Sequence, residues 1–182
     1  MGILHLWLPI LVSAIVVFAM SALVWTVLPW HKKDYSKCTN EDAVSNALKG
    51  SATGAYVLPH VADPAEFRND VVRQRYADGP NAFITVVANG LPKMGPKLAM
   101  SFLLNLLVGI VCAYLLSRML NPEAPYLEVF RLTGTTAFVA YGMGYFQESI
   151  WFGRPWSLTM KNLFDALLYG LLTGGVFGWL YI

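Results

Sequence analysis

Apolar residues are concentrated in four long runs, which cover residues 4–30, 98–116, 129–147 and 163–182. A helix needs about 20 mostly apolar residues to cross the hydrocarbon core of a bilayer, and each run is close to this length or longer. We therefore predict four transmembrane helices. The third run gives the weakest signal, because it contains Arg131, three threonines and two tyrosines. The alternative for this run is a position partly at the membrane interface.

The sequence between the first two runs is polar and has a different pattern. Residues 39–42 resemble a helix start, and Asp63 followed by Pro64 is a stronger start signal, because the carboxylate can cap the first turn. Short stretches rich in aromatic and β-branched residues at 56–58 and 83–87 predict two strands. This part of the chain is therefore predicted to mix helix and strand.

Together these patterns predict an all-α membrane protein. It is a four-transmembrane-helix bundle with a small α/β extramembrane segment between the first and second spans. The predicted organisation is a transmembrane helix in residues 1–30, the extramembrane segment in 31–96 and three further transmembrane helices in 97–182. An α/β segment of this size is marginally stable alone. We expect the helix ends or a partner to support it.

The composition favours a membrane location. Of the 182 residues, 56% are hydrophobic and only 13% are charged, whereas a soluble domain carries about 25% charged residues. A soluble protein of this size could not bury such long apolar runs, so this class is excluded. The net charge of +2 is too small to indicate nucleic-acid binding. The first run exceeds the ~7–15-residue core of a signal peptide, so we expect it to be retained.

Lysine and arginine are distributed unevenly about the predicted spans. If all four runs cross the membrane, residues 31–96 and 149–161 share one side, and eleven of the 13 Lys and Arg residues lie in or at the edge of these segments. Lys and Arg close to span ends are retained in the cytoplasm. We therefore predict that residues 31–96 are cytoplasmic and that both termini are periplasmic, in a multi-pass protein of the cell inner membrane.

Small and polar residues recur at every fourth position in two of the runs. Such strips let helix backbones approach closely and allow side-chain hydrogen bonds within lipid. We interpret them as helix-packing strips; the alternatives are a pore or substrate groove, or a docking face for another protein. The positions are Ser101, Asn105, Gly109, Ala113 and Ser117 in the second run, and Gly170, Gly174 and Gly178 in the fourth.

Charged residues gather around the connection between the third and fourth runs. This predicted interfacial charge cluster consists of Glu148, Arg154, Lys161 and Asp165. Asp165 lies about one turn inside the fourth run, where a charge is costly and needs a partner or water. We interpret the cluster as a salt-bridge group that fixes the turn. The alternative is a pair, Glu148 and Asp165, that handles protons or ions.

Metal-ligand and catalytic signals are weak. His60, Cys38 and Asp63 are the best candidates for metal ligands, but they lack a recognised ligand spacing, and Asp63 is better placed as a helix cap. The sequence contains no nucleophile elbow, no HExxH motif, no P-loop and no dinucleotide fingerprint. We predict no catalytic residues, no bound metal and no cofactor, although an intramembrane enzyme needs none of these motifs.

Three stretches carry a resemblance to known proteins: residues 28–35 (LPWHKKDY), 90–95 (GLPKMG) and 149–157 (SIWFGRPWS). They resemble an uncharacterised family of bacterial multi-pass inner-membrane proteins of about this length. The resemblance implies a bacterial origin and a multi-pass location. It implies no activity, cofactor or site residue, because no activity is assigned to that family.

Three functional hypotheses follow from the sequence. The first is a non-enzymatic accessory or assembly subunit of a membrane complex, since catalytic groups are lacking and packing strips are present. The second is a small oligomeric transporter or channel, motivated by the polar strip of the second run and by Asp165. The third is a membrane enzyme or metal-binding protein. The expected partners are the lipid bilayer and other membrane proteins or further copies of the chain, and not nucleic acid.

Overall fold

The computed structural model describes residues 2–181. These residues form two compact units. The first, called here the helical unit, contains residues 2–36 and 93–181. The second, the connecting unit, is Lys37–Pro92. Each unit is described by itself.

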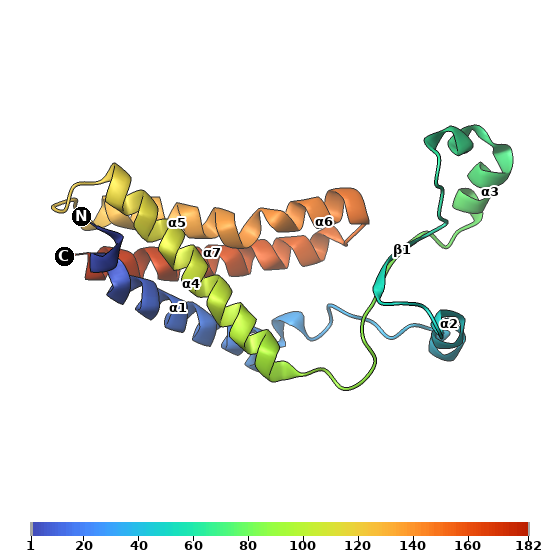
Figure 1. The fold of residues 1–182 in the computed structure, drawn as a ribbon, viewed down its shortest axis with the longest axis horizontal. Helices are drawn as coiled ribbons and strands as arrows, with labels where there is room; N and C mark the ends of the chain where they lie inside the picture. The colour runs from blue at the N-terminus through green and yellow to red at the C-terminus, as the bar shows by residue number, and fades with distance from the viewer. Residues whose placement is uncertain (1, 182) are drawn as a thin grey trace. The chain divides into compact units, whose positions relative to one another are not determined.

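The helical unit consists of long helices joined by short connections (Figure 1). The first helix is preceded by a 3-10 turn, Ile3–Leu6, and continues into a π-helical turn, Leu23–Val27. The α-helices are α1 (Trp7–Ala22), α4 (Met94–Met119), α5 (Tyr126–Gly142), α6 (Gly144–Phe152) and α7 (Trp156–Leu180).

Within residues 2–181, three helices are long and apolar enough to cross a membrane: Ile3–Val27, Met94–Met119 and Trp156–Leu180. They indicate a multi-pass membrane protein. The predicted third span, residues 129–147, falls on α5 and α6, which follow each other with a break at Met143. With 17 and 9 residues, neither helix alone has the length of a span.

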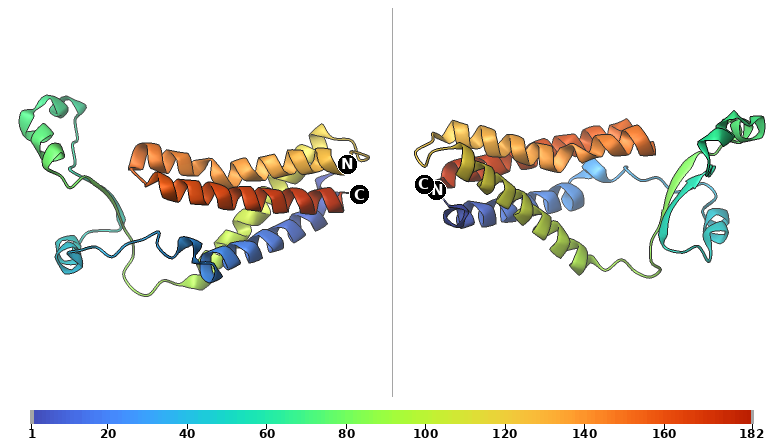
Figure 2. Two further views of the ribbon diagram at one scale, coloured as in Figure 1. Left: turned by 180° about the vertical axis from the view of Figure 1, so that it is seen from behind. Right: turned by 45° about the horizontal axis from the view of Figure 1, so that its top comes forward.

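Helices α5 and α7 lie side by side (Figures 1 and 2). Glycines allow the close approach. A Cβ atom added at Gly170 would lie 2.8 Å from the carbonyl oxygen of Gly134, and one added at Gly174 would lie 2.8 Å from that of Phe130. Real side chains do not make such short contacts with backbone. The two backbones therefore touch at these positions.

The apolar core lies where α1 begins and α7 ends, at the same end of the helical unit (Figure 1). The hydroxyl of Tyr181 donates a hydrogen bond to the carbonyl of Asn121 there, at 3.1 Å. This cluster joins α1, α4, α5 and α7 and includes Leu6, Ile10, Cys112, Leu116, Val129 and Phe177.

At the other end of this unit the helices separate. Helix α4 packs on α1, and a Cβ atom at Gly109 would lie 3.3 Å from the carbonyl oxygen of Ile10. The pair α1 and α4 then diverges from the pair α5 and α7 toward the end of α1 and the start of α4 (Figure 2). This end contains the polar residues described below.

The connecting unit contains a two-stranded antiparallel sheet and two short helices. Strand β1 (Gly54–Leu58) pairs with β2 (Ala82–Val86), and the helices are α2 (Glu41–Leu48) and α3 (Asp70–Asp78). The prediction of a mostly helical chain with a small α/β segment between the first two spans is thus confirmed.

The helix predicted after Asp63 is split in two. Asp63 caps a 3-10 turn, Pro64–Arg68, by accepting a hydrogen bond from the Ala65 N–H at 2.8 Å. Asn69 then adopts an extended backbone and accepts from the Val71 N–H at 2.8 Å, which starts α3. A second cap inside the expected helix therefore ends the first turn.

Candidate functional site

Four charged or titratable side chains meet at the open end of the helical unit. The 3-10 turn Pro29–His31 follows the first span and brings His31 onto α7. The Nε2 atom of His31 lies 2.8 Å from Oδ2 of Asp165, and its Nδ1 atom lies 2.5 Å from Oδ2 of Asp34. These side chains are only 3%, 6% and 4% exposed, respectively.

Lys161 completes this group, which we call the His31 cluster. Its ammonium donates hydrogen bonds to Oδ1 of Asp34 at 2.5 Å and to the carbonyl of Trp30 at 2.9 Å. The cluster joins the chain after the first span to α7. It contains two acidic and two basic groups, so with a protonated imidazole its net charge is zero.

The geometry of His31 determines how many protons the cluster holds. Both ring nitrogens face a carboxylate oxygen, and each contact needs one proton to be a hydrogen bond. Either the imidazole is doubly protonated or one carboxyl group carries a proton. Burial raises the pKa of the Asp34 carboxyl, but the hydrogen bonds and positive charges of Lys161 and His31 lower it by more. Asp34 is therefore ionised at neutral pH.

Trp25 fixes the orientation of the imidazole. Its ring stacks on His31 with centroids 3.9 Å apart and planes 3° from parallel. Trp25 lies in the π-helical turn, in which the Leu28 N–H donates to the carbonyl of Leu23. A π-turn rotates the following side chains relative to an α-helix, and such turns are frequent at functional sites. Here the π-turn directs the Trp25 ring toward the segment that contains His31.

A polar cavity of ≈ 440 Å³ lies between the helices beside this cluster. All five helices of the helical unit contribute to it. The polar residues that line it are Ser21, Thr26, Ser101, Asn105, Tyr141, Tyr145, Asn162, Asp165 and Tyr169.

Two amide groups in this cavity have donors without a partner. Asn105 and Asn162 are 5% and 3% exposed, and the Nδ2 atom of each makes no hydrogen bond within residues 2–181. The Oδ1 atom of Asn105 does accept one, from the Tyr141 hydroxyl at 3.2 Å. Buried donors are nearly always paired, so these two amides are exceptional among the residues that line the cavity.

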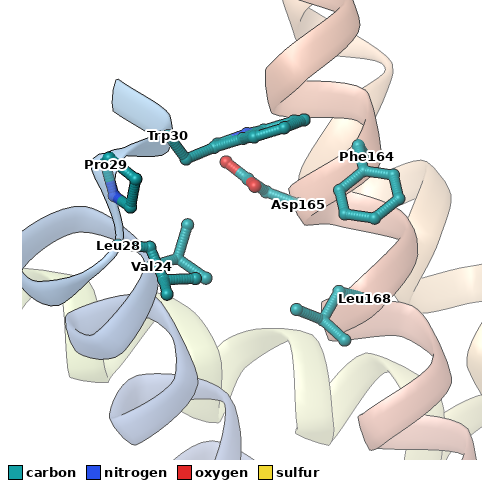
Figure 3. Close-up of a pocket in the computed structure, with 7 residues that line it drawn as sticks. All are labelled: Val24, Leu28, Pro29, Trp30, Phe164, Asp165 and Leu168. Atoms are coloured by element: carbon teal, nitrogen blue, oxygen red, sulfur yellow. The ribbon is translucent and has the colours of Figure 1, made fainter. Parts of the chain in front are cut away.

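A second cavity of ≈ 430 Å³ lies on another side of Asp165 (Figure 3). Its lining is apolar except for this carboxylate, which points into the space beneath the ring of Trp30 (Figure 3). Asp165 thus lines both cavities. The other lining residues are Val24, Leu28, Pro29, Phe164 and Leu168.

The structure brings together only part of the charge cluster expected from the sequence. Lys161 and Asp165 belong to the His31 cluster. Glu148 is exposed on α6 and forms no ion pair within the described residues. Arg154 donates its backbone N–H to the Glu148 carbonyl at 3.2 Å, and its guanidinium lies 5.3 Å from the centre of the Tyr145 ring. No contact joins Glu148 to Asp165 in this part of the chain.

The strip of the second run is divided between two environments. Ser101 and Asn105 line the polar cavity. Gly109 contacts α1 and Ala113 is fully buried, while the Ser117 hydroxyl donates to a carbonyl of its own helix. In the fourth run, all three glycines face α5. A Cβ atom at Gly178 would lie 2.7 Å from the ring of Tyr126, whereas Cβ atoms at Gly170 and Gly174 would meet the backbone of α5.

The metal-ligand candidates lie in the connecting unit. Cys38 and His60 are exposed there, and Asp63 caps a turn. Among residues 2–181, no group of three or more His, Cys, Asp or Glu is arranged to hold a metal ion.

Sequence reasoning considered His31 only as a weak metal-ligand candidate and did not assign His31, Asp34 or Asn162 to this site. A signal for the first two was present. His31 and Asp34 stand three positions apart directly after an apolar run, where titratable groups lie at the membrane boundary. Asn162 stands three positions before Asp165 and shares its helix face.

Comparisons of the chain with protein-family models, with curated proteins and with solved structures give no match. The function is therefore argued from the geometry of the site.

Proposed function

We propose that this chain is a small membrane transport protein whose solute site is the polar cavity of the helical unit. One observation carries the proposal: Asn105 and Asn162, whose buried Nδ2 donors lack a partner within residues 2–181, both line the same cavity. The solute is a small polar molecule that offers hydrogen-bond acceptors to these two amides.

The energetics of a membrane interior support this reading. A buried donor without a partner costs about 1–3 kcal/mol, and polar side chains inside membrane helices usually mark functional sites. The cavity volume of ≈ 440 Å³ is within the usual range of small-molecule sites, about 300–1,000 Å³. Water or a solute in the cavity would remove the free-energy cost that the unpaired donors carry when the cavity is empty.

Four crossings are part of the proposal. In addition to the three long helices, α5 and α6 together form one crossing, which is third along the chain and broken at Met143. The contact of α5 with α7 along its glycines supports it. So does the position of the start of α1 and the end of α7 at one end of the unit (Figure 1), since an even number of crossings requires this.

We also propose a bacterial inner-membrane location, with residues 31–96 in the cytoplasm and both termini in the periplasm. The excess of Lys and Arg on one side supports this orientation. An alkaline-phosphatase fusion after residue 182 tests it, and we expect an active phosphatase. An inactive fusion, together with a fluorescent cytoplasmic reporter at the same position, would contradict this orientation.

Cysteine labelling tests the proposed solute site. In a Cys38→Ser background, we expect a small charged thiol reagent to label Ser21→Cys, Ser101→Cys and Asn105→Cys, because a charged reagent reacts only where water enters. Ala113→Cys is the matched control on the same helix, since Ala113 is fully buried away from the cavity. Native Cys112 is fully buried and stays unlabelled. Protection of all three cavity positions would contradict the proposal.

A second candidate function, an accessory or assembly subunit, is favoured by the connecting unit. Pro59 is the one buried residue among residues 37–92, all of which the structure describes. The exposed apolar residues of the connecting unit include Val44, Phe67, Val71, Val87 and Leu91. A partner protein that covers these residues would stabilise the unit.

Limited proteolysis distinguishes this second candidate function from the transport function. If a partner covers the connecting unit, cleavage within residues 37–92 is slow in native membranes and fast after purification in mild detergent. Equal cleavage rates in both preparations would remove the assembly function and leave the transport function unaffected.

A further inference from the structure

The apolar cavity beside Asp165 contains one charged group in an otherwise apolar lining (Figure 3). The Oδ2 atom of Asp165 is held by His31, whereas its Oδ1 atom accepts no hydrogen bond from residues 2–181. We infer that this cavity binds a lipophilic organic cation, that is, a positively charged group carrying apolar substituents. This goes beyond the proposed solute site, because both the cavity and the ligand chemistry differ.

Charge complementarity selects the ligand class. A carboxylate in an apolar cavity attracts a cation much more strongly than it would in water, and it repels an anion. A small hydrated ion would lose its water shell against apolar walls that cannot replace it. A neutral apolar molecule would gain nothing from Asp165. An organic cation satisfies the carboxylate and the walls together.

The aromatic residues of the cavity favour the same ligand. The rings of Trp30 and Phe164 lie 5.5 Å apart between centroids and are tilted by 45°. The ring of Trp30 lies over the carboxylate of Asp165, and the ring of Phe164 lies beside this residue (Figure 3). Ring faces attract cations. Val24 and Leu168 complete an aliphatic wall for the apolar substituents.

Binding of a cation has a consequence for the His31 cluster. When the ligand binds, Asp165 changes its partner from the His31 ring, which it contacts through Oδ2, to the cation. The titratable groups around this carboxylate and along the two cavities are His31, Asp34, Lys161, Tyr141, Tyr145 and Tyr169. Helices α1 and α4 contribute no titratable group to either lining among the described residues.

Equilibrium dialysis of the full chain in detergent tests the inference, with tetraphenylphosphonium as the probe and protein-free micelles as the blank. We expect saturable binding of this cation. Tetraphenylborate has the same shape and the opposite charge, and it should not bind saturably. Equal binding of the two probes would overturn the inference.

Variants locate the site. Asp165→Asn should weaken tetraphenylphosphonium binding by about tenfold or more. Leu168→Trp should block the cavity while leaving the His31 cluster unchanged, so it gives a result even if Asp165→Asn fails to fold. Phe102→Ala is the control, because Phe102 contacts Phe18 away from this cavity. If both test variants bind as the unmodified chain does, the inference is wrong, whatever the cysteine labelling shows for the polar cavity.

Discussion

The helical unit and the connecting unit both contain helices with recognisable start and end signals, yet they are held together differently. In the helical unit, backbones touch at Gly170 and Gly174 and buried charges join distant parts of the chain. In the connecting unit, hydrogen bonds between neighbouring residues predominate, such as the caps at Asp63 and Asn69, and Pro59 alone among residues 37–92 is buried.

This difference shows what each unit can do. A site with fixed geometry needs side chains locked by packing, and the helical unit provides this around His31. The connecting unit has little buried apolar surface to offset the entropy lost on ordering. Its local helices and two-stranded sheet are therefore expected to open readily. Four predictions test this comparison, from the largest expected effect to the smallest.

The largest effect is expected for His31→Ala. The change leaves the buried Asp34 and Asp165 without their shared partner, and breaking a buried ion pair in this way costs about 3–5 kcal/mol. The apparent melting temperature in detergent should fall strongly. The double variant His31→Ala with Asp165→Asn should recover part of the loss, because it removes one of the unpaired charges. If the two changes are additive, the pair does not interact as described.

Gly174→Ala should have the next largest effect. Its Cβ atom would meet the Phe130 carbonyl at 2.8 Å and Gly134 at 3.1 Å, so α5 and α7 must separate, at a cost of about 1–3 kcal/mol. Gly175→Ala is the matched control on the next residue, where the nearest atom lies at 4.0 Å. Thermal unfolding should show a loss for the first variant alone. An equal response of both would mean that α5 and α7 do not touch at Gly174.

A smaller effect is expected in the connecting unit. Asn69→Ala removes the cap of α3 and should cost about 1 kcal/mol, seen as roughly fivefold faster hydrogen exchange within α3. Gln74→Ala, on the same helix but away from the cap, should change exchange little. The rate of hydrogen exchange in α4 and α7 should not change. A change there would show that the two units are energetically coupled, which would contradict the difference drawn between them.

The smallest effect is expected in the pH dependence of stability, through the carboxyl of Asp34. Its pKa is lowered from the ordinary value of 3.8, so its stabilising contribution is fully present above pH 3.8 and is lost as the pH falls through the lower pKa of the folded state. Melting temperatures of the unmodified chain should fall in this acidic range. Asp34→Asn should show a shallower fall. Identical acid profiles would mean that Asp34 is not stabilised by Lys161 and His31.

Much of the fold could be predicted because its signals are local. The apolar runs predict the three long helices, and the caps and β-rich stretches predict the elements of the connecting unit. The break at Met143 was not predicted, although Gly142 and Gly144 flank it and glycine weakens a helix. The second cap at Asn69 was missed because the apolar residues Phe67, Val71 and Tyr76 on either side of it are spaced as on one face of a continuous helix.

The candidate site was only partly visible in the sequence. Lys161 and Asp165 attract notice as charges in or beside an apolar run. Their partner His31 is 134 positions from Asp165 along the chain. No periodicity or spacing links positions so far apart, because the contact depends on how α7 lies against the chain after the first span. For the same reason, the unpaired amide of Asn162 is apparent only when its neighbours are known.

The shared position of Asp165 has a thermodynamic consequence. One carboxylate serves as a lining group of two chambers, so occupancy of one chamber alters the free energy of filling the other. By linkage, the factor by which the first occupant changes the affinity for the second equals the factor in the reverse direction. An amphiphile in one chamber and a hydrophilic molecule in the other would thus act reciprocally through the carboxylate of Asp165.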